Sequence, residues 1–241
     1  MHLKGKYSVS ALTHGFSRIE EDIESPRLFA PPSENANKGA GGTDAGTAFH
    51  RAMEKLDFKR IPLAGSDGER EGEFEELAAF ADAELSRMVK CRYITSEQRE
   101  SIDVRLLIRF LSSPLCARMK KAADKGKLKR ESRFVMEVPA SDIDPSVKSS
   151  EPVLIQGVAD AWFTERSSTL PETDEIILVD YKTDRVPYRE AEQVLKKRYS
   201  GQLGMYGSAL SRASGLKVGE CLIYSLFTGL EIRIDPHEIA D

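Results

Sequence analysis

An apolar run that ends in an acid and an amine limits most strongly how this chain can fold. Residues 176–179 are continuously apolar, and Asp180 and Lys182 follow them with one residue between. Such a run, rich in β-branched residues, is typical of a sheet strand. Because side chains alternate between the faces of a strand, Asp180 and Lys182 are expected on one side and Tyr181 on the other. The sequence therefore predicts an acid and a base held together at a strand end.

The segments around this run indicate a sheet covered by helices. Strands are expected at residues 134–138 and 153–163 before it, a helix at about 188–214 after it, and a closing hairpin from strands 221–227 and 230–234. A further helix, capped at Thr43 or Asp44, precedes the strands. Apart from a helical insertion, the order is helix, three strands, helix and then a strand or hairpin. That order predicts an α/β or α+β fold with a mixed sheet and helices on its faces.

The helical insertion is expected at about residues 73–126. Residues 74–93 carry apolar side chains at helical spacing. Thr95 and Gln98 match a capping box for a second helix that continues through Phe110. A third helix is expected after Ser113, which precedes a proline as a typical helix cap does.

The N-terminal part of the chain contains a segment with the composition of a linker. Residues 31–46 are rich in Pro, Gly, Asn and Ser, which predicts a flexible connection. It would separate a small helical element within residues 1–30, beginning near Tyr7, from a main domain at residues 47–241.

A second acid, Asp160, lies among apolar residues in the strand predicted before the apolar run. A buried, unpaired carboxylate costs several kcal/mol, so it needs a cation, hydrogen-bond donors or an altered pKa. An ion pair that closes the strand would explain Asp180 and Lys182 alone, but a hairpin would also bring Asp160 level with Asp180. A divalent cation, Mg²⁺ or Mn²⁺, would relieve the repulsion between the two carboxylates. The chemistry expected of such a site is phosphodiester hydrolysis by a metal-bound water, with Lys182 orienting the water or stabilising the transition state.

Four motifs in this order resemble those of the PD-(D/E)XK nucleases of the RecB type. They are Gly46-Thr47-Ala48-Phe49-His50, Gly157-x-x-Asp160, the run Asp180-Tyr181-Lys182-Thr183-Asp184-Arg185, and Gln202-x-x-x-Tyr206. Within this superfamily the sequence looks most like the C-terminal nuclease domain of the AddA type of bacterial helicase–nuclease. The similarity covers most of the chain, from about residue 7 to residue 234. It implies a restriction-endonuclease-like core for the main domain.

The resemblance also implies a metal site. Asp160 and Asp180 would bind the metal through their carboxylates, and Tyr181 through its backbone carbonyl. His50 matches the histidine that lies near the metal in the family. Without the motif, a histidine hydrogen-bonded within the core would be the simpler interpretation of His50.

By the same resemblance Lys182 would be the catalytic lysine. Gln202 and Tyr206 are four positions apart, so they share one face of a helix. They would orient Lys182 or contact DNA; helix packing alone is the alternative.

Some features depart from the family pattern. Arg133 stands before Phe134 where the family often has proline, so no role is carried over to Glu131. The three cysteines are too few and too widely spaced for an iron–sulfur cluster or a zinc ribbon, and no cluster is expected. No G-x-x-x-x-G-K-[ST] sequence occurs either. The chain is therefore expected to be either an excised nuclease domain or a nuclease without its own helicase.

DNA contacts are expected from local basic clusters, because the net charge of the whole chain is −4. Residues 118–133 contain eight basic residues against two acids, and a basic stripe of this kind can follow phosphates. The residues selected for nucleic-acid binding are Lys129, Arg130, Arg133 and Arg185. A solvated helix end and loop is the alternative interpretation of this segment.

The sequence thus predicts a metal-dependent DNA nuclease, acting on single-stranded ends as an exonuclease in double-strand-break repair. The expected partners are DNA and a helicase, either a domain of the same longer chain or a partner subunit such as AddB. The alternatives are a catalytically silent nuclease fold used for DNA binding or assembly, and an independent structure-specific endonuclease. No apolar stretch approaches the roughly 20 residues needed to cross a bilayer and no signal segment is apparent, so no membrane partner and a cytoplasmic location are expected.

Overall fold

A mixed sheet of six strands forms the centre of the protein. The computed structural model describes residues 6–9, 43–62, 70–143, 152–167 and 172–235. The strands are β1 (Lys6–Ser8), β2 (Leu128–Pro139), β3 (Pro152–Arg166), β4 (Asp174–Lys182), β5 (Val218–Ser225) and β6 (Glu231–Ile234). Their order is β1-β3-β4-β5-β6, with β2 also paired to β3. Strands β1 and β3 and strands β4 and β5 pair in parallel, and the other pairs are antiparallel.

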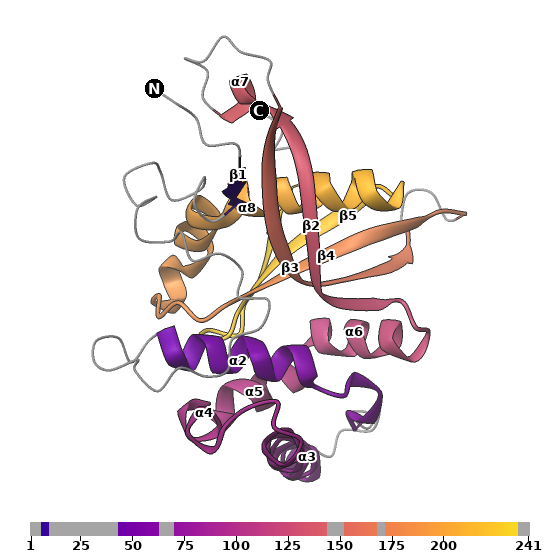
Figure 1. Cartoon of the computed structure of the whole chain (residues 1–241). Coiled ribbons are helices and arrows are strands. Elements are labelled where there is room, and N and C mark those ends of the chain that lie inside the picture. The colour runs from indigo at the N-terminus through magenta and orange to yellow at the C-terminus, as the bar shows by residue number, and fades with distance from the viewer. Residues whose placement is uncertain (1–5, 10–42, 63–69, 144–151, 168–171, 236–241) are drawn as a thin grey trace.

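Helices cover the sheet on two sides. They are α2 (Thr43–Lys55), the 3₁₀ helix η2 (Phe58–Arg60), α3 (Arg70–Lys90), α4 (Ser96–Ser101), α5 (Val104–Leu111), α6 (Pro114–Asp124), α7 (Ala140–Ile143) and α8 (Tyr188–Ser214). Helices α2 to α6 gather below the sheet in Figure 1, and α8 runs along its other side. The predicted order of helix, three strands, helix and hairpin, with a helical insertion, is confirmed.

The layers enclose two hydrophobic cores. One core contains α2, the insertion helices and the sheet residues Val179, Tyr181 and Tyr224. The second core lies between α8 and the opposite side chains of the same strands, such as Leu178 and Ile223. Strand β4 is buried on both faces, which is why its sequence is continuously apolar rather than alternating.

The β2–β3 hairpin passes from one core to the other. Near its open end, Leu128 and Phe163 pack with the insertion helices. Further along, Phe134 and Ile155 pack against the core of α8. The change of side falls between these positions, at the level of Glu131 and Asp160. These two acids therefore lie where the two cores meet.

Three expectations differ from the structure in detail. The single helix predicted from Thr95 through Phe110 is two helices, because the Asp103 side chain accepts a hydrogen bond from the Arg105 N–H and caps α5 separately. Tyr7, where a helix was expected to begin, lies in β1, where it pairs with Ile155. The last residues of the predicted linker 31–46 belong to α2, which begins at Thr43. The rest of that linker and residues 10–30 lie outside the described residues.

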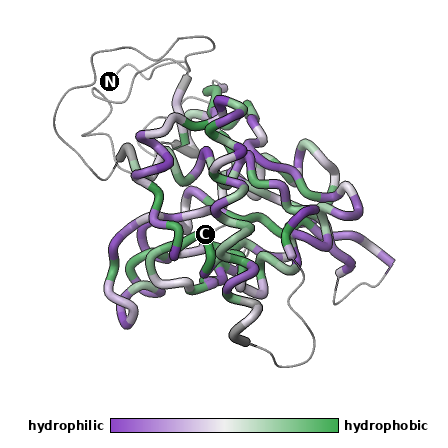
Figure 2. Tube along the Cα trace, turned by 90° about the horizontal axis from the view of Figure 1, so that it is seen from below, coloured by the Kyte–Doolittle hydropathy of each residue, from purple (hydrophilic) through white to green (hydrophobic). Residues whose placement is uncertain are grey.

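The described helices were also compared with the requirements of a bilayer. None of them combines the length and the apolar character needed to span one. Figure 2 shows the reason, since hydrophilic and hydrophobic residues are interleaved along the trace.

Candidate active site

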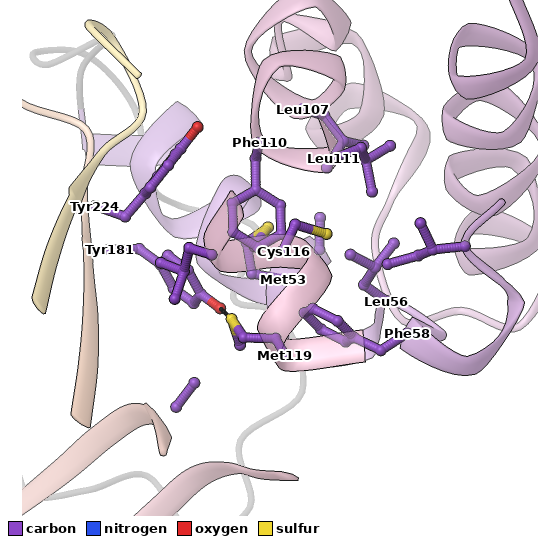
Figure 3. Close-up of a cluster of buried hydrophobic side chains, with 14 of the residues drawn as sticks. Met53, Leu56, Phe58, Leu107, Phe110, Leu111, Cys116, Met119, Tyr181 and Tyr224 are labelled. Carbon is purple, nitrogen blue, oxygen red and sulfur yellow. Dashed lines mark hydrogen bonds between the residues drawn. The ribbon is translucent and has the colours of Figure 1, made fainter. Parts of the chain in front are cut away.

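The end of β4 places an acid and an amine together, as the alternation of the strand predicts. The Asp180 side chain is almost fully buried, and its Oδ2 atom lies 2.7 Å from Lys182 Nζ. Tyr181 points to the opposite side, into the core of the insertion helices (Figure 3), where its hydroxyl donates to Met119 Sδ at 3.5 Å. The prediction of one shared side for Asp180 and Lys182 is confirmed.

Asp160 lies level with Asp180 on the neighbouring strand. Ala161 pairs with Val179, so the next residues in the antiparallel register are the two acids. Asp160 Oδ2 accepts a hydrogen bond from the Tyr181 N–H at 2.8 Å. Its Oδ1 atom lies 3.3 Å from His50 Nδ1 on α2. Residues from α2, β3 and β4 thus meet at one point.

Glu131 joins this group, although the sequence analysis carried no role over to it. Potential ligand atoms of His50, Glu131 and Asp160 all lie within 4.8 Å of one another. The backbone of Glu131 has φ = 48°, a conformation that is uncommon for residues other than glycine. Its position opposite Asp160 could have been found only by pairing β2 with β3, because the missing proline hid the family pattern.

A chain of hydrogen bonds links Lys182 to α8. Lys182 Nζ donates to Gln202 Oε1 at 3.2 Å, and Gln202 Nε2 donates to the Tyr206 hydroxyl at 2.8 Å. Gln202 and Tyr206 are both buried. The structure therefore places both residues where the resemblance predicts that they would orient Lys182.

Two carboxyl groups of this site hold their protons unusually tightly. Burial raises the pKa of Asp180 to about 6, and the charge of Asp160 adds to this more weakly than Lys182 opposes it. Burial, with the charge of Asp160, also raises the pKa of Glu131 to about 6. Burial lowers the pKa of His50, but its hydrogen bond to Asp160 and the charge of that group outweigh this effect, so the net shift is upward. The site favours added positive charge.

The donor set fits a divalent metal ion. Among the described residues, Asp180 Oδ2 is a buried oxygen that makes no hydrogen bond of acceptable geometry, despite its short ion pair with Lys182. Carboxylate oxygens and an imidazole nitrogen are suitable ligands for Mn²⁺, and carboxylates for Mg²⁺. A cation would neutralise the acids and satisfy the oxygen that the protein leaves without a hydrogen bond.

These pKa shifts predict that the metal-free protein loses stability as the pH rises from about 5 to about 7.5. A group with a raised pKa in the folded state contributes stability that is complete below its unfolded pKa, 3.8 for Asp180, and is lost as the pH rises through about 6. Glu131 and His50 act in the same direction. Carboxyls with lowered pKa values, such as Glu84, titrate below this range. We expect a loss of roughly 2 kcal/mol in the free energy of unfolding.

Urea denaturation at several pH values in EDTA measures this change. Asp180→Asn should remove much of the pH dependence, because it replaces the buried acid with a group that does not titrate. An equally steep dependence in Asp180→Asn would contradict the assignment.

The residues predicted to contact DNA fall into two groups. Lys129, Arg133 and Arg185 are exposed, as phosphate contacts require. Arg130 does not fit the prediction, because its guanidinium donates to the backbone carbonyl of Leu56 and lies over the Phe58 ring, 5.4 Å from its centroid. Burial lowers the pKa of Arg130. Arg130 thus ties β2 to the end of α2; periodicity alone did not distinguish it from its exposed neighbours.

The fold and the site together define a class of enzyme. A mixed sheet between helices, with two acids and a lysine at adjacent strand ends, is the arrangement that the motifs imply. The family model of the PD-(D/E)XK nuclease superfamily matches residues 21–237, and the chain belongs to this superfamily.

The individual relatives confirm the narrower resemblance. The chain is similar to proteins named as the A-type subunits of ATP-dependent helicase/nucleases: 30% identical over 91% of the chain to that of Clostridium botulinum (strain Alaska E43 / Type E3), and 34% identical over 83% of the chain to that of Oenococcus oeni. The corresponding protein of Acetivibrio thermocellus is 33% identical over 93% of the chain. The chain spans only 16% of the length of each of these relatives.

Proposed function

We propose that this chain hydrolyses phosphodiester bonds in DNA with a divalent metal ion, acting on single-stranded ends as an exonuclease. The observation that carries the proposal is the buried Asp180–Lys182 pair, which lies at the end of β4 beside the cluster of Asp160, His50 and Glu131. An acid–amine pair that only closed a strand would need none of the other three groups. Membership of a nuclease superfamily supports the same conclusion.

The residues that would hold the metal are Asp160, Asp180, His50 and the backbone carbonyl of Tyr181, with Glu131 as a further candidate ligand. When bound, Mg²⁺ or Mn²⁺ supplies a Lewis acid that activates water and neutralises charge on the scissile phosphate. Glu131 enters this set because its carboxylate lies in one cluster with the ligand atoms of His50 and Asp160. No iron–sulfur cluster is proposed, since the cysteines Cys91, Cys116 and Cys221 lack the spacing for one.

Lys182 is the group of this chain that acts on the phosphate. Its ammonium group is held by Asp180 and Gln202, beside the candidate ligands. From there it can stabilise the negative charge that develops on the phosphoryl oxygens, or orient the attacking water. Tyr206 contributes indirectly by holding the Gln202 amide.

The proposed biological setting follows from the relatives. Their names describe one part of an ATP-dependent helicase/nuclease, and the chain matches a small share of each. We therefore propose that the chain works with a helicase, supplied by a longer chain of which it is a part or by a partner subunit such as AddB. It would degrade single-stranded DNA ends in cytoplasmic double-strand-break repair, with Lys129, Arg133 and Arg185 contacting phosphates.

A cleavage assay tests the proposal. End-labelled single-stranded, duplex and branched DNA are incubated with the chain in Mg²⁺, Mn²⁺ or EDTA, and metal binding is followed separately by calorimetry. We expect cleavage of single strands from an end, complete loss of cleavage in EDTA, and loss of both cleavage and metal binding in Asp180→Asn. Glu131→Gln should weaken metal binding by about 10–100-fold if Glu131 is a ligand or supports one.

The other outcomes of this assay distinguish the alternatives. Cleavage that persists in EDTA or in Asp180→Asn would exclude the proposed site. Binding of DNA with no cleavage in either metal would favour the catalytically silent module. Preferred cutting of branched duplexes would favour a structure-specific endonuclease.

A further inference from the structure

An aromatic ring lies beneath the ammonium group of Lys182. The Nζ atom is 4.1 Å from the centroid of the Tyr199 ring, which α8 supplies one turn before Gln202. The same Nζ atom lies 2.7 Å from Asp180 Oδ2 and 3.2 Å from Gln202 Oε1. Lys182 therefore has three partners: a carboxylate, an amide oxygen and the face of a ring.

Tyr199 is itself fixed in place. Its hydroxyl donates to Asp184, with distances of 2.9 and 3.1 Å to the two carboxylate oxygens. Arg198 donates to the same carboxylate at 2.7 Å. Burial, together with the charge of Asp184, raises the pKa of Tyr199, so the phenol remains a neutral donor. Asp184 thus joins the segment after β4 to α8 and sets the orientation of the ring.

The three partners of Lys182 have different fates in a working nuclease. Asp180 is a candidate metal ligand, and a carboxylate that binds a cation attracts a nearby ammonium group less strongly. Gln202 is neutral and offers one hydrogen bond. A ring face within about 6 Å attracts a cation and does not compete for it with a metal, and a lysine side chain has a long flexible stem that needs such fixing.

We propose that Tyr199 is a positioning residue for Lys182: the face of its ring holds the ammonium group beside the scissile phosphate. This inference rests on the proposed nuclease function. The ring contributes through its π face, whereas its hydroxyl only orients the ring through Asp184.

Two substitutions separate the ring from the hydroxyl. Tyr199→Phe keeps the π face, and Tyr199→Leu keeps an apolar side chain but removes the face. We expect kcat to fall about tenfold in Tyr199→Leu with KM changed by less than about twofold, and both to stay within about threefold of the parent in Tyr199→Phe. Tyr199→Met serves as a second variant without a ring should the leucine variant unfold.

A readout that does not depend on cleavage is the NMR signal of the Lys182 ε-methylene group in protein labelled with ¹³C-lysine. A ring face at 4.1 Å should move this signal upfield in the parent and in Tyr199→Phe, but not in Tyr199→Leu. The signal is assigned by its loss in Lys182→Arg. The matched control is Tyr93→Leu, which removes the same kind of contact at Lys55, where the distance from Nζ to the ring centroid is 5.3 Å. It should leave kcat and the Lys182 signal unchanged.

Several results would overturn the inference. They are an unshifted Lys182 signal in the parent, unchanged kcat in Tyr199→Leu, or an equal loss of kcat in Tyr199→Phe and Tyr199→Leu. A parent that cleaves no DNA in any metal would refute the nuclease function, and with it a catalytic purpose for the ring, even where the NMR signal demonstrates the contact.

Discussion

Lys182→Ala should slow DNA cleavage by at least about a hundredfold, the usual cost of removing a charge-stabilising donor from an active site. The ammonium group is the cation that the fold itself places against Asp180, inside hydrogen-bond distance of α8. Its loss removes a positive charge where the phosphate would become more negative. Steady-state cleavage of single-stranded DNA at saturating Mg²⁺ measures the change. KM should move much less than kcat, because the charge develops in the transition state.

The same substitution should destabilise the metal-free protein. Removing one partner of a buried ion pair leaves the other buried and uncompensated, at a cost of about 3–5 kcal/mol. Added Mg²⁺ should restore much of the stability, since it neutralises Asp180, but it should not restore cleavage. This divergence separates a catalytic lysine from a structural one. Recovery of cleavage together with stability would show that Lys182 serves only to support the fold.

A suitable control is Lys90→Ala. Lys90 is an exposed lysine at the end of α3, away from the β4 end. Its removal changes the net charge by the same amount and should leave both cleavage and stability close to those of the parent. A comparable loss of cleavage in this variant would indicate a general effect of charge on DNA binding.

The sequence was sufficient to predict the part of the site that depends on strand geometry. Alternation along β4 placed Asp180 and Lys182 on one side, and the expected hairpin brought Asp160 level with Asp180. These predictions succeeded because each depends on a short, regular element whose period is fixed. The capping box at Thr95 and the helix start at Ser113 succeeded for the same reason.

The features that the sequence did not predict depend on contacts between distant segments. Glu131 reaches the site because two long strands cross from one core to the other at that level, with a backbone conformation that local pattern does not predict. Arg130, its neighbour, is held by carbonyl groups of α2 instead of remaining free for DNA. The ring of Tyr199 meets Lys182 only because α8 lies across the sheet. In each case the relevant partner is far away along the chain.

Gly157 shows how such contacts give meaning to a motif residue. A Cβ atom at this position would lie 2.6 Å from Cζ of Phe134 and 2.9 Å from Cε1 of Tyr206. The rings of Phe134 and Tyr206 are packed edge to face, with centroids 5.3 Å apart. The glycine is therefore required by the close approach of these rings, and not by a positive φ.

Gly157→Ala is accordingly expected to damage both stability and cleavage. Overpacking should cost about 1–3 kcal/mol, measured by urea denaturation. Moving the Tyr206 ring also disturbs the hydroxyl that holds Gln202, and through it Lys182, so kcat should fall by more than about tenfold even under conditions in which the variant is fully folded.

Two further variants make this prediction specific. Gly207→Ala, also next to Tyr206, introduces a Cβ atom whose nearest neighbour is 3.6 Å away, so it should be tolerated or slightly stabilising. Phe134→Leu in the Gly157→Ala background removes the ring with the shortest contact and should recover part of the lost stability and kcat. If Gly157→Ala were as active as the parent, or if Phe134→Leu gave no recovery, the hydrogen-bonded chain from Tyr206 to Lys182 would not be the route by which Gly157 acts. Because the two rings, the amide and the ammonium group form one series of contacts, space at a glycine on β3 determines where a lysine on β4 can act.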